Sequence, residues 1–115
     1  MEDEPILLKA LTIMLAGGGY QVVSSDNGKD GLELVKAEKP DLLLLDLLMP
    51  VMDGFEVLQE LQSTHLIKSL PVIALTNLGQ DEDKKKAIAL GAKYFFVKSA
   101  TNLDDLIALI GKIIP

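Results

Sequence analysis

The chain of 115 residues contains no cysteine and no tryptophan, and aromatic residues make up only 4% of it. Without cysteine, disulfide bonds and thiol chemistry are excluded, which is compatible with a reducing cytosol. Basic residues are also scarce, 11 against 17 acidic residues, and the formal net charge is −6. Binding to the phosphate backbone of a nucleic acid requires a basic face, so we expect no nucleic-acid partner.

Long hydrophobic runs are missing as well. No run approaches the roughly 18 to 20 apolar residues that span a membrane, and the N-terminus is acidic rather than basic and then apolar. We therefore expect a cytoplasmic protein without a membrane partner. The length, the 49% hydrophobic content and the absence of a Pro/Ser-rich linker predict a single domain over residues 1–115.

The chain does contain a regular alternation of short apolar runs and helical periods. The runs are almost continuously apolar, as in parallel strands that are covered on both faces, and they predict strands near residues 20–24, 41–46, 71–76 and 93–98. Five segments with helical spacing alternate with them, near residues 8–15, 32–35, 55–61, 87–90 and 103–110. This alternation predicts an α/β fold with a doubly wound parallel sheet, whose ligands bind at the carboxyl ends of the strands.

Asp46 is the most informative residue because it places a carboxylate at the end of the apolar run Leu42-Leu43-Leu44-Leu45. An unpaired buried charge costs several kcal/mol, so this carboxylate needs a compensating partner or a function. Candidate partners are the acidic cluster Glu2-Asp3-Glu4 and the residues that end later apolar runs, Thr76 and Lys98. Several carboxylates at one site repel one another unless a cation lies among them, and hard oxygen ligands select Mg²⁺ or Ca²⁺.

Several motifs follow one another in a defined order. They are Glu2-Asp3-Glu4-Pro5, Pro40-Asp41-Leu42-Leu43-Leu44-Leu45-Asp46, Met49-Pro50-Val51-Met52-Asp53-Gly54, Pro71-Val72-Ile73-Ala74-Leu75-Thr76, Gly91-Ala92 and Lys98. Over the whole chain they resemble the receiver domains of bacterial response regulators in two-component signalling. The resemblance implies a flavodoxin-like fold with the sheet order 2-1-3-4-5.

The resemblance also implies roles for individual residues. Asp46 would accept a phosphoryl group from a histidine kinase or a phosphotransfer protein. The carboxylates of Glu2, Asp3 and Asp46 and the backbone carbonyl of Leu48 would hold Mg²⁺. Phosphoryl transfer needs charge neutralisation and positioning more than acid–base chemistry, which a divalent ion and one lysine can supply.

Thr76 and Lys98 would contact the phosphoryl oxygens in a receiver domain. The conformational switch would couple Thr76 to Phe95, and because Phe95 lacks the hydroxyl of a tyrosine, the switch would act through packing alone. The family usually has Lys-Pro with a cis bond where this chain has Lys98-Ser99. A cis bond before serine costs about 3 to 4 kcal/mol, so a trans bond that re-aims the lysine is the alternative.

The first strand of the family is missing from this sequence. Similar receivers begin with an apolar central strand that leads into the acidic pair, whereas here Met1 directly precedes Glu2. Losing about four buried aliphatic residues at roughly 1.5 to 3 kcal/mol each forfeits about 6 to 12 kcal/mol, against a whole stability of about 5 to 15 kcal/mol. Our hypothesis is a misassigned start, and the alternative is a deliberate truncation or design.

A gap at the centre of the sheet has to be filled or closed, because buried backbone groups almost always find partners. We favour a homodimer that exchanges a strand or another segment. The alternative is a rearranged monomer in which residues 20–24 pair directly with residues 41–46. In both cases we expect Glu2 and Asp3 to be poorly anchored for Mg²⁺ and phosphorylation to be weak.

Three functions compete at this point. The leading one is a phospho-accepting signalling switch, not an enzyme, that passes its state to an unidentified output protein by protein–protein contact. The second is a receiver-like interaction module that is not phosphorylated, such as a truncated or engineered receiver. The third and least favoured is a phosphatase of the haloacid dehalogenase type with an aspartate nucleophile, because that class carries a second acid two residues later, where this chain has Leu48.

Overall fold

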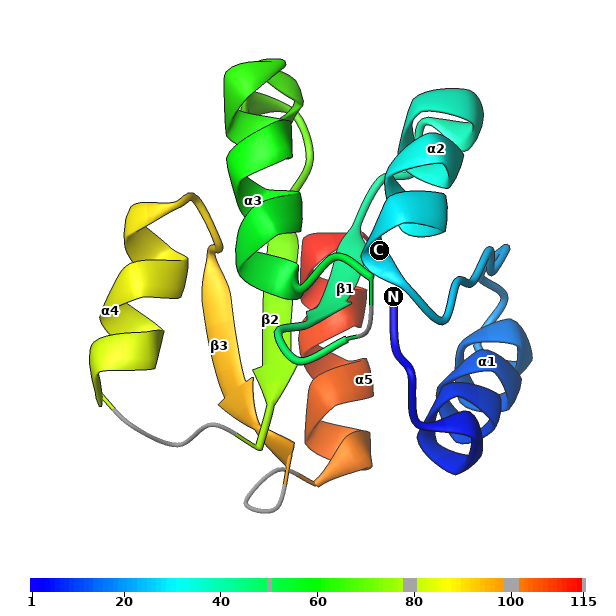
Figure 1. Ribbon diagram of the computed structural model, residues 1–115. Helices are drawn as coiled ribbons and strands as arrows, with labels where there is room; N and C mark the ends of the chain where they lie inside the picture. Colours follow the sequence, from blue (N-terminus) through cyan, green and yellow to red (C-terminus); the bar gives the residue numbers. More distant parts are fainter. Residues whose placement is uncertain (50, 78–80, 99–101, 115) are drawn as a thin grey trace.

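The computed structural model describes residues 1–49, 51–77, 81–98 and 102–114. In these residues five α-helices, three β-strands and one short 3-10 helix follow one another along the chain (Figure 1). The elements are α1 (Pro5–Gly17), α2 (Gly28–Glu38), β1 (Leu43–Asp46), α3 (Gly54–Ser63), η1 (Leu66–Lys68), β2 (Val72–Thr76), α4 (Asp81–Ala89), β3 (Tyr94–Val97) and α5 (Leu103–Ile113). No helix among the described residues combines the length and the apolar character of a membrane span.

The three strands form one parallel sheet in the order β1, β2, β3. Leu43 lies opposite Val72 at the start of β1, and Thr76 lies opposite Val97 at the end of β2. Each strand begins and ends within two residues of its predicted position. Because all three strands run in the same direction, their carboxyl ends meet at one edge of the sheet, which is where ligands of doubly wound folds bind.

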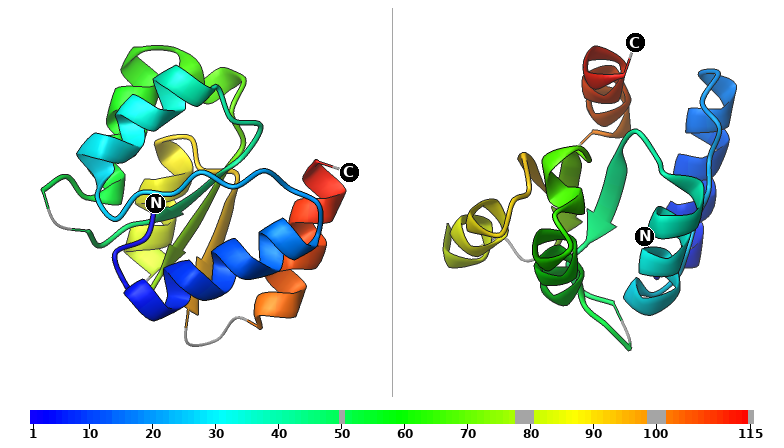
Figure 2. Two further views of the ribbon diagram at one scale, coloured as in Figure 1. Left: turned by 90° about the vertical axis from the view of Figure 1, so that its right-hand side faces the viewer. Right: turned by 90° about the horizontal axis from the view of Figure 1, so that it is seen from above.

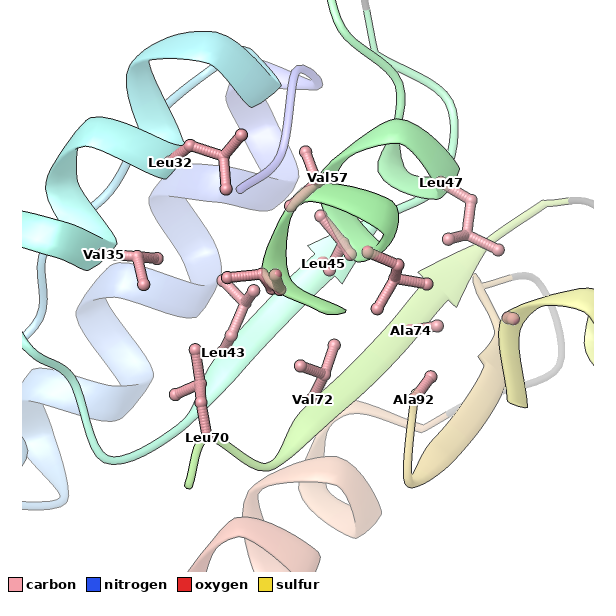
Figure 3. Packing of buried hydrophobic residues seen from close by; sticks show 13 residues of the cluster. Leu32, Val35, Leu43, Leu45, Leu47, Val57, Leu70, Val72, Ala74 and Ala92 are labelled. Carbon is pink, nitrogen blue, oxygen red and sulfur yellow. The ribbon is translucent and has the colours of Figure 1, made fainter. Parts of the chain in front are cut away.

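Helices cover both faces of the sheet, so the predicted α/β fold is confirmed. On one face α1 and α5 lie next to each other (Figure 2) and enclose a cluster that includes Leu11, Ile73 and Ile110. On the other face α2, α3 and α4 enclose a larger cluster of leucines, valines and alanines, with Leu45 at its centre (Figure 3). Both faces of β1 and β2 are thus buried over most of their length, which explains why their sequences are almost continuously apolar, whereas β3 at the edge of the sheet is partly exposed.

The strand predicted over residues 20–24 is not formed, and these residues lie in coil. A strand requires a hydrogen-bonded neighbour along its length, and this segment instead faces the position of the missing central strand. The neighbouring backbone is limited to the first residues of the chain, where the Glu2 N–H donates to the carbonyl of Ser25 at 3.0 Å. The apolar pair Val22-Val23 has a composition typical of a strand, but the prediction was wrong because no strand of the described residues lies beside this segment.

Met1 and Glu2 occupy the carboxyl end of that central position. The Met1 ammonium donates to the carbonyl of Leu44 at 2.8 Å, and the Met1 carbonyl accepts from the N–H of Asp46 at 3.0 Å. Together with the bond from Glu2 to Ser25, these contacts follow the pattern of a strand that is parallel with β1. They hold β1 and residues 20–25 apart, so the expected alternative of direct pairing between these segments is wrong.

The Met1 side chain also explains a glycine inside a helix. A Cβ atom on Gly31 would lie 2.5 Å from the sulfur of Met1. Glycine costs about 1 kcal/mol relative to alanine in a helix interior, so its presence in α2 is explained by this close approach. The first two residues are therefore packed between α2 and β1.

We predict that a polypeptide prepared with a free amine at Met1 has a stability that depends on pH. Burial lowers the pKa of the Met1 ammonium from 8.0 to about 6, against the opposing attraction of the Glu2 and Asp46 carboxylates. The folded state therefore binds fewer protons than the unfolded state, and the contribution is complete above pH 8 and is lost as the pH falls towards 6. Two pKa units correspond to about 2 to 3 kcal/mol of unfolding free energy.

An N-terminally acetylated chain is the matched control, because it keeps the N–H donor and lacks the charge. Urea unfolding of both chains at several pH values should give equal stabilities near pH 8.5 and an acetylated chain that is more stable near pH 6. A difference that does not change with pH would contradict the buried amine.

Candidate functional site

Charged side chains from distant parts of the sequence meet at the carboxyl edge of the sheet. Asp46 ends β1, Lys98 directly follows β3, and Glu2 is held next to β1 by the backbone bonds of Met1. Glu2 and Asp46 are almost completely buried, with 3% and 2% of their surface exposed. Two buried carboxylates at one place require positive charge or hydrogen-bond donors.

Lys98 provides that positive charge. Its ammonium nitrogen Nζ lies 2.8 Å from Oε2 of Glu2, 2.9 Å from Oε2 of Glu4 and 3.0 Å from Oδ2 of Asp46. Burial alone would lower the pKa of Lys98, but the three carboxylates outweigh it and raise the pKa above its ordinary value. The lysine is therefore charged throughout the physiological pH range and connects β3 to both β1 and the N-terminus.

The pKa values of two of the carboxylates are raised as well. Burial raises the pKa of Asp46, while hydrogen bonds from the Leu48 N–H and from Lys98 act against it. Burial also raises the pKa of Asp3, and the neighbouring Asp46 carboxylate adds to this effect. The site thus holds more negative charge than one lysine balances, which favours the entry of a cation.

Glu2, Asp3 and Asp46 could hold a metal ion. Each offers one carboxylate oxygen, and the three oxygens lie within 4.8 Å of one another. Oε1 of Glu2 is buried and has no hydrogen-bond partner in the described part of the chain. Because carboxylate oxygens are the ligands that Mg²⁺ prefers, both the donor set and this unpartnered oxygen fit that ion. Our expectation that Glu2 would be poorly anchored is wrong, because Met1 pairs with β1 and Lys98 binds Glu2.

The loop after β1 fixes the orientation of Asp46. The Leu48 N–H donates to Oδ1 of Asp46 at 3.0 Å, while the Leu48 side chain is 51% exposed. Asp53 ends the loop and caps α3, with its side chain accepting from the N–H of Glu56 at 2.9 Å. A Cβ atom on Gly54 would lie 2.5 Å from the carbonyl oxygen of Asp46, so glycine is required where α3 meets the strand.

Thr76 and Phe95 lie on neighbouring strands but are not directly opposite each other in the sheet register. Thr76 is buried at the end of β2, and Phe95 lies opposite Ala74, two residues earlier along the sheet. The Phe95 ring is partly buried against the core on the side of α3 and α4. The roles predicted for these two residues remain predictions, and the Lys98-Ser99 bond falls outside the described residues.

Two contributions to the site were not assigned from the sequence. Glu4 was recognised as part of the acidic cluster, but its contact with Lys98 was not foreseen, and its position beside two acids was the available signal. The backbone of Met1, which anchors Glu2, left no signal in residue types because its contribution comes from main-chain atoms.

The fold and the site together define a class: a flavodoxin-like α/β domain with an acidic cluster and a lysine at the carboxyl edge of its parallel sheet. A family model described as "Response regulator receiver domain" matches residues 1–111. The chain therefore belongs to the receiver domains of response regulators, the signalling modules of two-component systems.

Known relatives agree with this assignment. Protein PilH of Pseudomonas aeruginosa is 36% identical over 98 residues, which cover 85% of this chain and 81% of PilH. The transcriptional regulatory protein AfsQ1 of Streptomyces coelicolor is also 36% identical over 98 residues, but the chain spans only 42% of its length. The crystal structure of a DNA-binding response regulator of the LuxR family from Staphylococcus aureus has a TM-score of 0.88 at 28% identity, covering 97% of this chain and 92% of that one.

We predict that Lys98→Met destabilises the protein strongly. The substitution keeps most of the aliphatic stem but leaves the buried carboxylates of Glu2 and Asp46 without their cation. Breaking a buried ion pair from one side typically costs about 3 to 5 kcal/mol. The control is Lys93→Met at an exposed position, which should change the unfolding free energy by less than about 0.5 kcal/mol. Equal effects of the two substitutions in urea unfolding would show that the Lys98 cluster is not a stabilising element.

Proposed function

We propose that this chain is a phospho-accepting switch in which Asp46 takes a phosphoryl group from a histidine kinase or a phosphotransfer protein. The observation that carries the proposal is the state of Asp46, a buried carboxylate between a lysine and two further acids. A merely structural strand-end aspartate would need one donor, whereas this one is bonded on both oxygens and surrounded by excess negative charge. We also propose that the protein consists of this single domain, lies in the cytoplasm and is not an enzyme.

The proposed transfer uses Asp46 as a nucleophile. One carboxylate oxygen forms a bond to phosphorus while the bond between phosphorus and the imidazole nitrogen of the donor histidine breaks, and the electron pair of that bond stays on the nitrogen. The Leu48 N–H holds Oδ1 in place throughout. The Lys98 ammonium, 3.0 Å from Oδ2, is positioned to turn towards a phosphoryl oxygen as negative charge arrives. The Thr76 hydroxyl at the end of β2 is the second proposed contact.

Mg²⁺ would be held by the carboxylates of Glu2, Asp3 and Asp46 and by the backbone carbonyl of Leu48. When bound, the ion supplies charge neutralisation for the incoming phosphoryl group. The unpartnered oxygen of Glu2 supports this assignment, because a buried acceptor without a donor is otherwise unfavourable. The protein's own residues then set the position of Asp46 and exclude water from one side of it.

The proposed output is a contact with another protein that senses the occupied site. Movement of Thr76 towards the phosphoryl group would change the packing of Phe95 between the sheet and α4. Because the Phe95 ring carries no hydroxyl, this change would act through packing alone. We also propose that the protein forms a homodimer in which the two copies exchange a segment. The second candidate function, an interaction module without phosphorylation, is favoured by one observation: Lys98 already satisfies Asp46 through an ion pair.

Phosphorylation separates these two functions. Incubating the purified chain with Mg²⁺ and acetyl phosphate should add the mass of one phosphoryl group, as measured by intact-mass spectrometry. Asp46→Asn should abolish the adduct, and Asp53→Asn, a neighbouring acid that caps α3 instead, should retain it. Asp3→Asn should lower the yield by weakening the metal site. A folded protein that gains no adduct under these conditions would establish the interaction module instead.

We also predict a long-lived phosphorylated state. In similar receivers the side chain two residues after the phosphoacceptor tunes hydrolysis, and here Leu48 cannot orient an attacking water. Leu48→Asn should speed the loss of the adduct severalfold, followed by mass spectrometry after removal of the phosphodonor. Val51→Asn, an exposed position in the same loop, is the matched control and should leave the rate unchanged. Equal or slower decay in Leu48→Asn would contradict the assigned role of this position.

A further inference from the structure

Of the three acids that bind Lys98, Glu4 is the one that faces solvent. Its oxygen Oε2 accepts a hydrogen bond from the Lys98 ammonium at 2.9 Å, and its side chain is 51% exposed. The side chains of Glu2 and Asp46 are only 3% and 2% exposed, and that of Lys98 is 10% exposed. Glu4 therefore stands between the buried ammonium and the surrounding water, a position to which the proposed phosphoryl transfer assigns no role.

All the donors of the Lys98 ammonium are engaged. A lysine carries three N–H donors, and Glu2, Glu4 and Asp46 each accept a hydrogen bond from it. A phosphoryl group on Asp46 would bring three acceptor oxygens to the place where a single carboxylate oxygen accepts now. For Lys98 to give a second donor to these oxygens, either Glu2 or Glu4 has to release the ammonium.

The two acids differ in what this release costs. Glu2 is buried, and without Lys98 its charge would keep only the hydrogen bond from the Glu4 N–H to Oε2. Leaving a buried charge without its partner is strongly unfavourable. The half-exposed Glu4 carboxylate can exchange the lysine for water at little cost. Glu4 is also the N-cap residue of α1 and its side chain makes no capping bond there, so the positive end of the helix dipole favours the freed charge.

We propose that Glu4 restrains Lys98 and competes with the incoming phosphoryl group for its N–H donors, which slows the phosphorylation of Asp46. Glu4 is a positioning residue, because its carboxylate acts through Lys98. This role rests on the proposed function, since a phosphoryl group has to reach Asp46. In the phosphorylated state the ammonium binds the phosphoryl oxygens and Glu2, and the Glu4 carboxylate is free in solvent at the start of α1.

The test measures how fast the phosphoryl adduct forms with acetyl phosphate at saturating Mg²⁺, followed by intact-mass spectrometry. Glu4→Gln should react severalfold faster than the unaltered chain, because a neutral amide releases the ammonium more readily than a carboxylate does. Glu4→Asp keeps the charge but is one methylene shorter, so it loses the contact and should also react faster. The control Asp105→Asn removes one charge from an exposed position in the first turn of α5 and should leave the rate unchanged.

Calorimetric titration with Mg²⁺ separates this role from a merely structural one. Glu4→Gln should bind Mg²⁺ severalfold more weakly, because the site loses a negative charge, while its phosphorylation at saturating Mg²⁺ is faster. Damage to the structure would lower both quantities.

The outcomes distinguish this role from the proposed function itself. If the unaltered chain is phosphorylated and Glu4→Gln reacts equally fast or more slowly, Glu4 does not restrain Lys98 and the phosphoryl switch stands. An equal acceleration in Asp105→Asn would also overturn the role of Glu4, because the cause would then be net charge. An adduct in Glu4→Gln alone would support the restraint in its strongest form. No adduct in either chain would refute the phosphoryl switch and the role of Glu4 with it.

Discussion

The ion cluster around Lys98 connects distant parts of the chain at the carboxyl edge of the sheet. A single ammonium joins Glu2 at the N-terminus, Asp46 at the end of β1 and the residue that follows β3. The contacts span almost the whole sequence, and they stand at the edge where the parallel strands end. Removing the ammonium would leave charges in a place from which water is largely excluded, which is costly. The arrangement of the site therefore depends on this one cation.

The same cluster fits both a stabilising role and the proposed phosphoryl transfer. Lys98 does not balance all the carboxylates, since Glu2, Asp3, Glu4 and Asp46 surround it. The remaining negative charge and the unpartnered oxygen of Glu2 favour a divalent cation. A lysine that is shared by three acids can exchange one of them for a phosphoryl oxygen without losing its charge compensation. In the proposed function, the structural and the signalling role would thus rest on the same atoms.

Much of the fold followed from the sequence because its signals were local. Continuous apolar runs predicted β1, β2 and β3, and helical periods predicted the helices between them, two of which are capped by Asn27 and Asp53 in the structure. The meeting of Asp46 with Lys98 followed from the geometry of parallel strands. The assignment of phosphoacceptor, metal ligands and switch residues came from resemblance to a family, and those roles await experiment.

The errors in prediction had a common physical cause: among the described residues, no strand lies between β1 and residues 20–25. Residues 20–24 have the composition of a strand but lack a ladder partner, so composition alone could not decide their structure. Glu2 seemed unanchored because no apolar run precedes it, yet main-chain bonds of Met1 replace that anchor. Backbone hydrogen bonds such as those of Met1 do not depend on residue type, so they could not be predicted from the sequence.

The central claim is that the Lys98 cluster is a phosphoryl site. It is tested most directly by a crystal structure grown with Mg²⁺ and beryllofluoride, a mimic of the phosphoryl group. We predict beryllium bonded to a carboxylate oxygen of Asp46, the ion between Glu2 and Asp3, and the Lys98 ammonium hydrogen-bonded to a fluorine instead of to Asp46. Beryllofluoride bound elsewhere, or an Asp46 that keeps its ion pair with Lys98 while the mimic stays in solution, would contradict it.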